Sequence, residues 1–257
     1  DKVIPGAYIN LLTNTPLSIS VGERGTVLIA QELSVGTDND IYEIAASEGA
    51  YPENASTADK KLAKLALMGA KTVLLYKLPT AHTDEHVETM LEALKTVDFD
   101  VLVYPYAKSG TAASAAQQKI AAWIKAMQDD EGKNVTAVLP NYPADTEYII
   151  NNTQGTVLSD GSSLTAYETA AWIGGITAGA SITKSNTAQK FEGAIDVVPR
   201  MTRSEQETAI KAGKFILDVD RSQNVTVVAD INSLTSIGQS KSDIMKQNRS
   251  VRTACGI

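Results

Sequence analysis

The sequence predicts an α/β protein: a mostly parallel sheet with helices on both faces, followed by an α+β portion with an antiparallel hairpin. Three observations lead to this prediction. Short apolar runs alternate with segments of helical periodicity along the first 140 residues, as in strand–helix–strand units. Those runs are continuously apolar, which is typical of strands covered on both faces. Near the end, two β-type runs flank a short polar turn, which favours a hairpin.

The chain opens with two short extended segments, which we expect at residues 4–10 and 17–21. The strands expected next cover residues 26–31, 71–78, 99–104 and 134–139, and Pro105 and Pro140 end the last two. The helices expected between them cover residues 40–47, 57–68, 83–97 and 111–128. Ser56 or Thr57 is the expected cap of the second helix, and Gly69 follows its end.

The last third begins with an expected helix over residues 164–180, which holds the small-residue cluster Gly174, Gly175, Ala178 and Gly179. Small side chains allow another backbone to approach closely, so a packing role is expected. An irregular or extended stretch at 191–198 follows, then a short helix capped by Ser204 and ending before Gly213. The hairpin strands are expected at 214–220 and 224–231, and a final basic helix at 241–253. Such a basic helix usually has a solvated face.

Composition excludes several classes of function. The net charge of −7 over 257 residues argues against a nucleic-acid-binding protein, which needs a clustered positive face, and against docking on anionic lipid. No apolar run approaches the ~20 residues that span a bilayer, so no membrane insertion is expected. The first residues lack the pattern of a signal peptide. Cys255 is the single cysteine, which excludes an intrachain disulfide and favours a reduced, cytoplasmic compartment.

One short motif suggests metal chemistry. Residues 82–86 read His-Thr-Asp-Glu-His, which fits a pattern of some zinc peptidases. A zinc site of that kind needs both histidines one turn apart on a helix, together with a third ligand. Pro79 lies just upstream, so His82 is expected at or before the helix start, and the chain has no third histidine. Asp84 and Glu85 are then ordinary first-turn acids that interact with the helix dipole.

A second alternative is a small-ligand site near Ser109. The segment Lys108-Ser109-Gly110-Thr111 follows a strand and opens a helix, where an anion can bind. It lacks the glycine spacing of a phosphate loop, so helix capping is the favoured interpretation. A soluble α/β enzyme or ligand-binding module nevertheless stays open, because this architecture hosts many chemistries. The sequence otherwise predicts no enzyme, no metal site and no cofactor.

Several segments, taken in order, resemble the phage tail sheath family. The opening resembles that family in residues 5–10 (PGAYIN) and 23–30 (ERGTVLIA), and the next strand does so in residues 69–78 (GAKTVLLYKL). Residues 173–179 (IGGITAG) are similar to the glycine-rich helix of the family. Residues 198–202, 212–217 and 230–235 continue the match at similar spacing. The ordered set covers most of the chain.

The resemblance differs from the family at two places. Many sheath proteins carry an inserted β-rich domain after the strand at 71–78, whereas here only residues 79–84 precede the next helix. The resemblance therefore implies a minimal sheath. The family also continues beyond the segment that resembles residues 248–257, so we expect a truncated subunit whose competence to assemble is an open question.

What the resemblance implies is mechanical work by a homo-oligomer. Sheath subunits stack as hexameric rings around a tail tube protein, between a baseplate and a terminator, and contract to drive the tube through a cell envelope. The implied location is the virion tail or a tail-like particle, made in the cytoplasm of the bacterial host. Subunits of the family exchange terminal extended segments, which add strands to a neighbour's sheet.

We therefore expect three parts: residues 1–22 as an extended segment near the exchanged arm, 23–140 as the α/β body, and 141–257 as its second part. The N-terminal stretch at residues 3–12 is the candidate arm, with an edge strand of its own domain as an equal alternative. The final basic helix is expected to supply contacts in the contracted state. The candidate subunit-contact residues are accordingly Val3, Ile4, Pro5, Gly6, Tyr8, Lys241, Lys246, Arg249 and Arg252.

Overall fold

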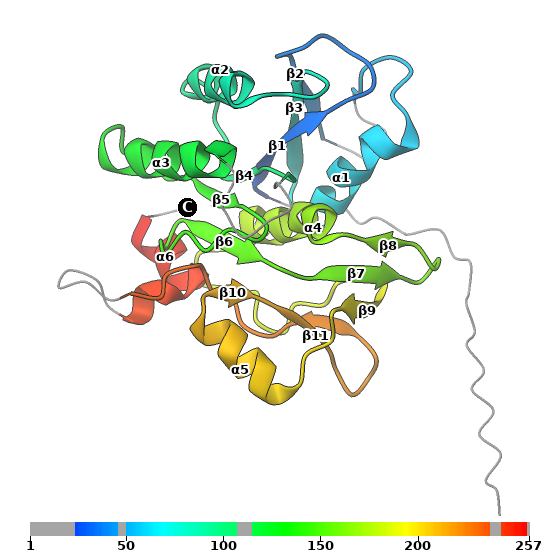
Figure 1. Ribbon diagram of the computed structural model, residues 1–257, viewed down its shortest axis with the longest axis vertical. Coiled ribbons are helices and arrows are strands. Elements are labelled where there is room, and N and C mark those ends of the chain that lie inside the picture. Colours follow the sequence, from blue (N-terminus) through cyan, green and yellow to red (C-terminus); the bar gives the residue numbers. More distant parts are fainter. Residues whose placement is uncertain (1–23, 46–49, 107–114, 237–242, 256–257) are drawn as a thin grey trace, which may run out of the picture.

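A seven-stranded sheet with the strand order β10-β6-β5-β4-β1-β3-β2 lies at the centre of the protein. The computed structural model describes residues 24–45, 50–106, 115–236 and 243–255 (Figure 1). Neighbouring strands run parallel except at one edge, where β2 pairs antiparallel with β3. The strands are β1 (Thr26–Glu32), β2 (Ile41–Ile44), β3 (Thr72–Leu78), β4 (Val101–Val103), β5 (Thr136–Val138), β6 (Ile149–Asn152) and β10 (Lys214–Phe215).

Helices cover both faces of this sheet. Side chains alternate between the faces along a strand, so Val27 and Ile29 of β1 point to one face while Leu28 and Ala30 point to the other. The first face packs against α1 (Thr57–Leu67) and α4 (Ala166–Gly179). The second face packs against α2 (Asp84–Leu94) and α3 (Ala115–Asp129). The predicted fold class is confirmed.

Helix α4 joins the large sheet to the rest of the protein. Thr165 caps it, and every residue from 169 to 178 is buried, which is typical of a helix surrounded on all sides. On the side away from the large sheet it packs against an antiparallel sheet of β7 (Gly155–Leu158), β8 (Ser163–Leu164) and β9 (Ala194–Val198). The ring of Trp172 stacks on that of Phe191, with 4.2 Å between the centroids. One hydrophobic core thus continues through α4 (Figure 1).

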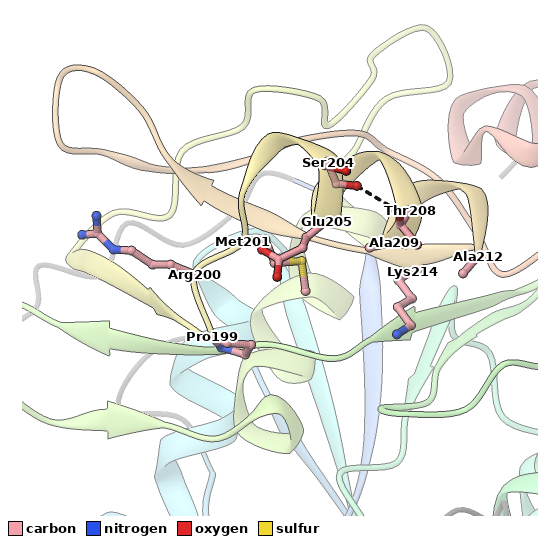
Figure 2. A pocket seen from close by; sticks show the side chains of 9 residues that line it. All are labelled: Pro199, Arg200, Met201, Ser204, Glu205, Thr208, Ala209, Ala212 and Lys214. Atoms are coloured by element: carbon pink, nitrogen blue, oxygen red, sulfur yellow. Dashed lines mark hydrogen bonds between the residues drawn. The ribbon is translucent and has the colours of Figure 1, made fainter.

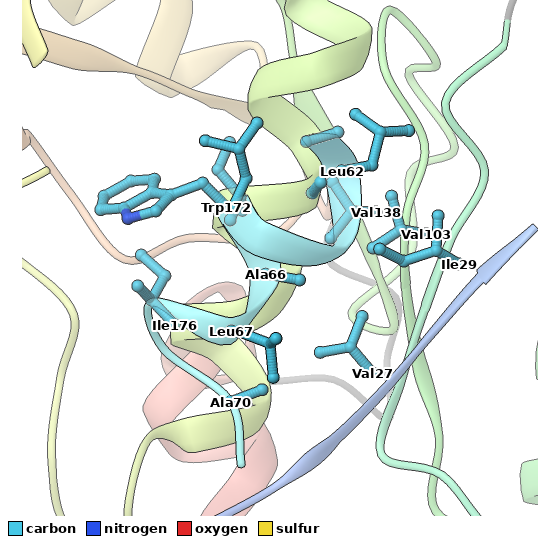
Figure 3. Packing of buried hydrophobic residues seen from close by; sticks show 14 of the residues in the cluster. Val27, Ile29, Leu62, Ala66, Leu67, Ala70, Val103, Val138, Trp172 and Ile176 are labelled. Carbon is cyan, nitrogen blue, oxygen red and sulfur yellow. The ribbon is translucent and has the colours of Figure 1, made fainter. Parts of the chain in front are cut away.

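The small residues of α4 allow it to cross α1 at close range (Figure 3). A Cβ atom on Gly175 would overlap the carbonyl oxygen of Ala66, and one on Gly179 would overlap that of Gly69. Both neighbours are backbone atoms, which have little room to shift. The packing role predicted for this cluster is confirmed.

The C-terminal third adds peripheral elements. The predicted hairpin is formed by β11 (Leu217–Val219) and β12 (Val225–Val227), although the preceding residues of its first strand form β10 and join the large sheet. Helix α5 (Arg203–Lys211) lies beside β10. The 3₁₀ helix η1 (Asp243–Lys246) and helix α6 (Asn248–Cys255) take the place of one continuous helix.

Three local predictions are wrong. Residues 40–47 were expected to be helical, yet residues 41–44 form the edge strand β2 beside β3. Thr202, and not Ser204, caps α5: its hydroxyl accepts from the Glu205 N–H while the Glu205 carboxylate accepts from the Thr202 N–H. The basic segment breaks at Gln247, which pairs in a β-bridge with Ile231. The two extended segments predicted before residue 22 lie outside the described residues.

Candidate functional site

The structure places three of the predicted subunit-contact residues. Lys246 lies at the end of η1, and Arg249 and Arg252 lie on α6. The other predicted contact residues lie outside the described ranges; they are Val3, Ile4, Pro5, Gly6, Tyr8 and Lys241. The three placed residues share one short segment but have different surroundings.

Lys246 and Arg249 are accessible to a partner. Lys246 is half-buried, and its Nζ atom lies 3.0 Å from Oδ1 of Asp243, one turn earlier. Arg249 is exposed. Surface ion pairs of this kind contribute little to stability, so Lys246 can change partners at low cost.

Arg252 is buried, and the prediction of a solvated basic face is wrong at this residue. Its Nη2 atom donates to the Lys184 carbonyl oxygen at 2.7 Å and to Oδ2 of Asp230 at 3.1 Å. Asp230 is buried too, and its other oxygen accepts from Nδ2 of Asn248 at 2.8 Å. The backbone N–H of Asn186 also donates to Asp230. We call Asp230, Asn186, Asn248 and Arg252 the Asp230 cluster.

The Asp230 cluster fastens α6 to the body of the protein. Its members come from the connection after α4, the segment after β12 and the helix α6 itself. Buried charges are tolerated when they are paired and hydrogen-bonded, so Arg252 serves the fold of its own chain. Sequence reasoning missed this cluster because its other members lie 18 to 44 positions away from Asp230 along the chain, and no local spacing connects them to it.

The two histidines of the zinc-like motif bind different partners. His82 lies before α2, as predicted, with Nδ1 2.6 Å from Oε1 of Glu32 and Nε2 2.6 Å from the hydroxyl of Tyr104. His86 lies in the first turn, and its Nδ1 accepts from the Thr83 backbone N–H. The part of the chain that the structure describes contains no group of three or more metal-ligating side chains. The two hydrogen bonds of His82 fix the β3–α2 connection to Glu32 at the end of β1 and to Tyr104 after β4. We call these contacts the His82 clamp.

Two tyrosines complete the surroundings of His82. The Tyr106 hydroxyl accepts from the Glu32 backbone N–H at 2.7 Å, and the Tyr106 ring lies 4.9 Å from the His82 ring. Burial raises the pKa of Tyr106 to about 12, and it raises the pKa of Tyr104 as well. Both hydroxyls therefore stay protonated at neutral pH, as donors and acceptors for the clamp.

The alternative ligand site near Ser109 lies outside the described residues. Within the ranges that the structure covers, no helix is long and apolar enough to cross a membrane. The described chain instead offers surface grooves.

The first groove, of about 360 Å³, lies between α5 and the end of β9. We call it the α5 groove. Its floor and walls include Pro199, Met201, Ala209, Ala212 and Lys214, and Figure 2 shows Met201 between α5 and Pro199. Just before it, Val198 is 55% exposed.

The second groove, of about 450 Å³, lies between α6, η1 and the connection that follows α4. We call it the α6 groove. Its lining includes Thr183, Ile244, Met245, Arg249 and Ala254. Ile244 is 64% exposed, and Ile182 beside this groove is 37% exposed. Exposed apolar side chains that gather at a groove mark a surface for contact with a polypeptide.

The comparison with protein families finds one model in this chain. Residues 80–233 match the model described as the phage tail sheath protein central domain. The match begins in the connection that His82 clamps and ends in the segment after β12, so it includes α4 and both antiparallel sheets.

Two curated relatives cover most of the chain. It is 34% identical to an uncharacterized protein of Bacillus subtilis, YqbK, over 98% of this chain and 53% of the relative. It is 30% identical to the tail sheath protein of Clostridium phage phiCD119, over 83% of this chain and 59% of that protein. The chain thus spans about half the length of the curated relatives it matches.

Solved structures show the same fold. The sheath tail protein of Desulfitobacterium hafniense is 26% identical and superposes with a TM-score of 0.80, over 98% of this chain and 80% of that one. The contracted helical sheath of the anti-feeding prophage has a TM-score of 0.67 at 15% identity, over 99% of this chain and 73% of that one, which is a likeness of fold.

Proposed function

The chain belongs to the phage tail sheath family, and from that premise we propose that it is a structural subunit of a contractile sheath. It would polymerise as stacked rings around an inner tube and contract to drive that tube through a cell envelope. The observation that carries the proposal is the family match over residues 80–233. The match includes β4, β5, β6 and β10 of the large sheet, the central helix α4 and both small sheets.

The way the core is built supports a role as a rigid building block. Helix α4 is buried against both the large sheet and the small one, and it crosses α1 with backbone-to-backbone contacts at Gly175 and Gly179. Packed cores of this kind are not continuously deformable. A change in the length of the polymer would therefore come from altered contacts between whole subunits, each of which keeps its fold.

We further propose that the N-terminal stretch at residues 3–12 links neighbours by adding a strand to another subunit's sheet. The described residues leave several strand edges open for such an addition: β2 and β10 in the large sheet, and β8 and β9 in the three-stranded sheet. Unpaired backbone N–H and C=O groups at an edge can bind an extended segment. Main-chain hydrogen bonds would hold subunits together while their bodies rotate.

Lys246 and Arg249 are the described cations that we propose for contacts between subunits, together with Lys241. Their partners would be acidic side chains of a neighbouring copy, and the chain carries an excess of these. Arg252 is left out of this set because it is committed to Asp230. The tail tube protein, the baseplate and the terminator are the other partners we propose. The proposed location is the tail of a virion or tail-like particle, assembled from subunits made in the bacterial cytoplasm.

The test of the function is negative-stain electron microscopy of the protein carried on to the length of its relatives, alone and co-expressed with a tube protein. Ribbed tubes or rings are the expected result. Small particles in both preparations would overturn the sheath proposal, because the co-expressed tube supplies the nucleus that a sheath needs.

The basic surface has its own test in the same assay. The double variant Lys246→Glu, Arg249→Glu should lower the yield of tubes, or block their contraction, by reversing the charge offered to the neighbour. The control is Lys95→Glu at the residue that follows α2, a side chain that is 45% exposed. Equal behaviour of both variants and the unchanged protein would remove this segment from the proposed contacts.

A further inference from the structure

The α6 groove is an apolar surface that none of the described elements fills. The structure describes four large hydrophobic side chains as exposed; one of them, Ile244, lines this groove, and another, Ile182, precedes the lining residue Thr183. Ile244 is the most exposed of the four, at 64%. A patch of this kind marks a binding surface, and the place where the described chain begins indicates what binds there.

The described chain begins beside Gly179, the last residue of α4. The Arg24 carbonyl oxygen accepts from the Lys71 backbone N–H at 3.0 Å, and a Cβ atom on Gly179 would lie 3.5 Å from that oxygen. Ile182 comes three residues after Gly179, and its carbonyl oxygen accepts from the hydroxyl of Thr253 on α6 at 3.1 Å. Arg24, to which the N-terminal segment is joined, therefore contacts a residue that lies only four positions before Thr183 of the groove lining.

That segment has the composition of an occupant. Residues 3–22 carry no charged side chain, and residues 3–12 read VIPGAYINLL. Fully extended, the 23 residues before Arg24 would reach about 75 Å, far more than a groove of about 450 Å³ requires. Arg249 is the only charged side chain on the lining, and it is exposed to solvent, so an uncharged segment need not pair with it.

We propose that in the free chain residues 3–12 occupy the α6 groove of their own molecule. The covalent link between the segment and its own groove favours binding within the same molecule over binding to a second copy. A segment joined by a short linker is present at its own groove at an effective concentration on the order of millimolar. In dilute protein this exceeds the concentration of any other copy. The tethered segment fills the groove first and covers Ile244 and Ile182.

The proposal goes beyond the sheath function, since it concerns a chain outside any polymer. It gives the proposed arm a resting position in which its apolar residues are kept from water. In a polymer, where neighbouring subunits reach a similar local concentration, strand addition to a neighbour would compete with this internal seat. Strand addition to a neighbour must then be more favourable than the binding of the segment in its own groove.

The test is a disulfide cross-link within the 257-residue chain at micromolar concentration. The variant Ala7→Cys, Ala254→Cys, Cys255→Ser has one thiol in the segment and one on the groove lining. With oxidised glutathione we expect a ring-closed monomer, seen as a faster band on a non-reducing gel. Its yield should be about tenfold above that of the control Ala7→Cys, Ala122→Cys, Cys255→Ser, because a seated segment meets the groove thiol far more often. Ala122 is exposed on α3, across the sheet.

Two results would overturn the proposal. Disulfide dimers whose yield rises with protein concentration would place the segment on a second copy, and equal closure with the groove and control thiols would show that no seat exists. A further variant checks the contact itself: Ile244→Asp in the cross-linking background should lower ring closure about tenfold, because the apolar wall is lost. Ile244 is 64% exposed, so the fold tolerates this change, and unchanged closure would count against the groove.

Discussion

At Arg252 a guanidinium group lies inside the fold, with 3% of its side chain exposed, and holds α6 against the body through Asp230. A buried ion pair is weak evidence for stability in itself, but the removal of one partner leaves the other charge uncompensated. The cost of losing Arg252 therefore exceeds the strength of the bond it makes.

We predict that Arg252→Met lowers the free energy of unfolding by about 3 kcal/mol, because Asp230 is left buried without its cation. The matched change Arg249→Met, three positions earlier on the exposed side of α6, should alter it by less than about 0.5 kcal/mol. Urea unfolding followed by circular dichroism measures both. Equal midpoints would show that the Asp230 cluster does not anchor the helix.

Asp59 illustrates a carboxylate that the fold keeps ionised. It lies in the first turn of α1, where it accepts from the backbone N–H and the hydroxyl of both Ser34 and Ser56. Burial alone would raise its pKa, but these hydrogen bonds outweigh burial and lower the pKa of Asp59 to about 2. The ionised form is thus favoured in the folded protein.

A depressed pKa stabilises the fold at pH values above the unfolded-state pKa, and this contribution is lost as the pH falls through the folded-state pKa. We predict that Asp59→Asn costs about 2 kcal/mol at pH 7. The difference from the unchanged protein should shrink as the pH falls from about 4 to about 2, since both chains then lack the charge. Denaturant titrations across that range measure it, and a constant difference would contradict the role of ionisation.

For single residues, contacts between neighbours in the sequence were predictable, and contacts between distant residues were not. The Ser56 cap of α1 follows from the sequence, and Thr202 with Glu205 is an equally local capping box that was overlooked in favour of Ser204. The surroundings of Arg252 depend on residues 22 and 68 positions away. The basic spacing of the segment alone could not reveal them.

Among the elements, the crossing of α1 and α4 is the contact with the least room. Gly175 faces a backbone carbonyl, that of Ala66, whereas the neighbouring Gly174 faces the side chain of Val103. A side chain can change its rotamer, but a carbonyl inside a helix is fixed by its own hydrogen bond. The two glycines therefore differ in tolerance despite their adjacent positions.

We predict that Gly175→Ala lowers the free energy of unfolding by about 3 kcal/mol, because the added methyl group forces the helices apart. Gly174→Ala should cost less than Gly175→Ala, since its methyl group would meet a side-chain methyl of Val103 in place of a backbone carbonyl, and alanine has the better helix propensity. Thermal unfolding of the two variants side by side gives the comparison. The reverse order would show that the crossing is looser than the contact distances indicate.

Strand β2 shows why some elements were mispredicted. The stretch at residues 40–47 was predicted to be helical, although Ile41, Tyr42 and Ile44 are residue types enriched in strands. In the structure it instead pairs with β3, and Ile44 is buried under the sheet. The residue types of this short segment thus agree with the strand, and the helix prediction gave them too little weight. The long periodic helices α1 to α4 were predictable because each buries a whole apolar face.

For the molecule as a whole, the core is continuous across the predicted boundary near residue 140. Helix α4 belongs to the second part of the chain, yet it packs on β1, β4 and β5 of the first part. Two parts that share one core are expected to unfold together. We therefore expect residues 23–140 and 141–257 to unfold in one transition.

The two tryptophans make this expectation measurable. Trp123 reports on α3, and Trp172 reports on α4 and its stacking with Phe191. In the single-tryptophan variants Trp123→Phe and Trp172→Phe, the fluorescence midpoint in urea should coincide with the circular-dichroism midpoint of the same variant. Separate midpoints within one variant would indicate two independently folding parts.

The short β3–α2 connection has a consequence for what this scaffold can carry. The clamp from His82 to Glu32 and Tyr104 fixes the turn on its α2 side, while Thr80 and Ala81 lie exposed at its tip. Lengthening a loop whose ends are already fixed costs only about 0.6 kcal/mol for each doubling. A sequence inserted between Thr80 and Ala81 would therefore lie at the surface of the subunit. We expect the stability of the core to depend little on the length of that insertion.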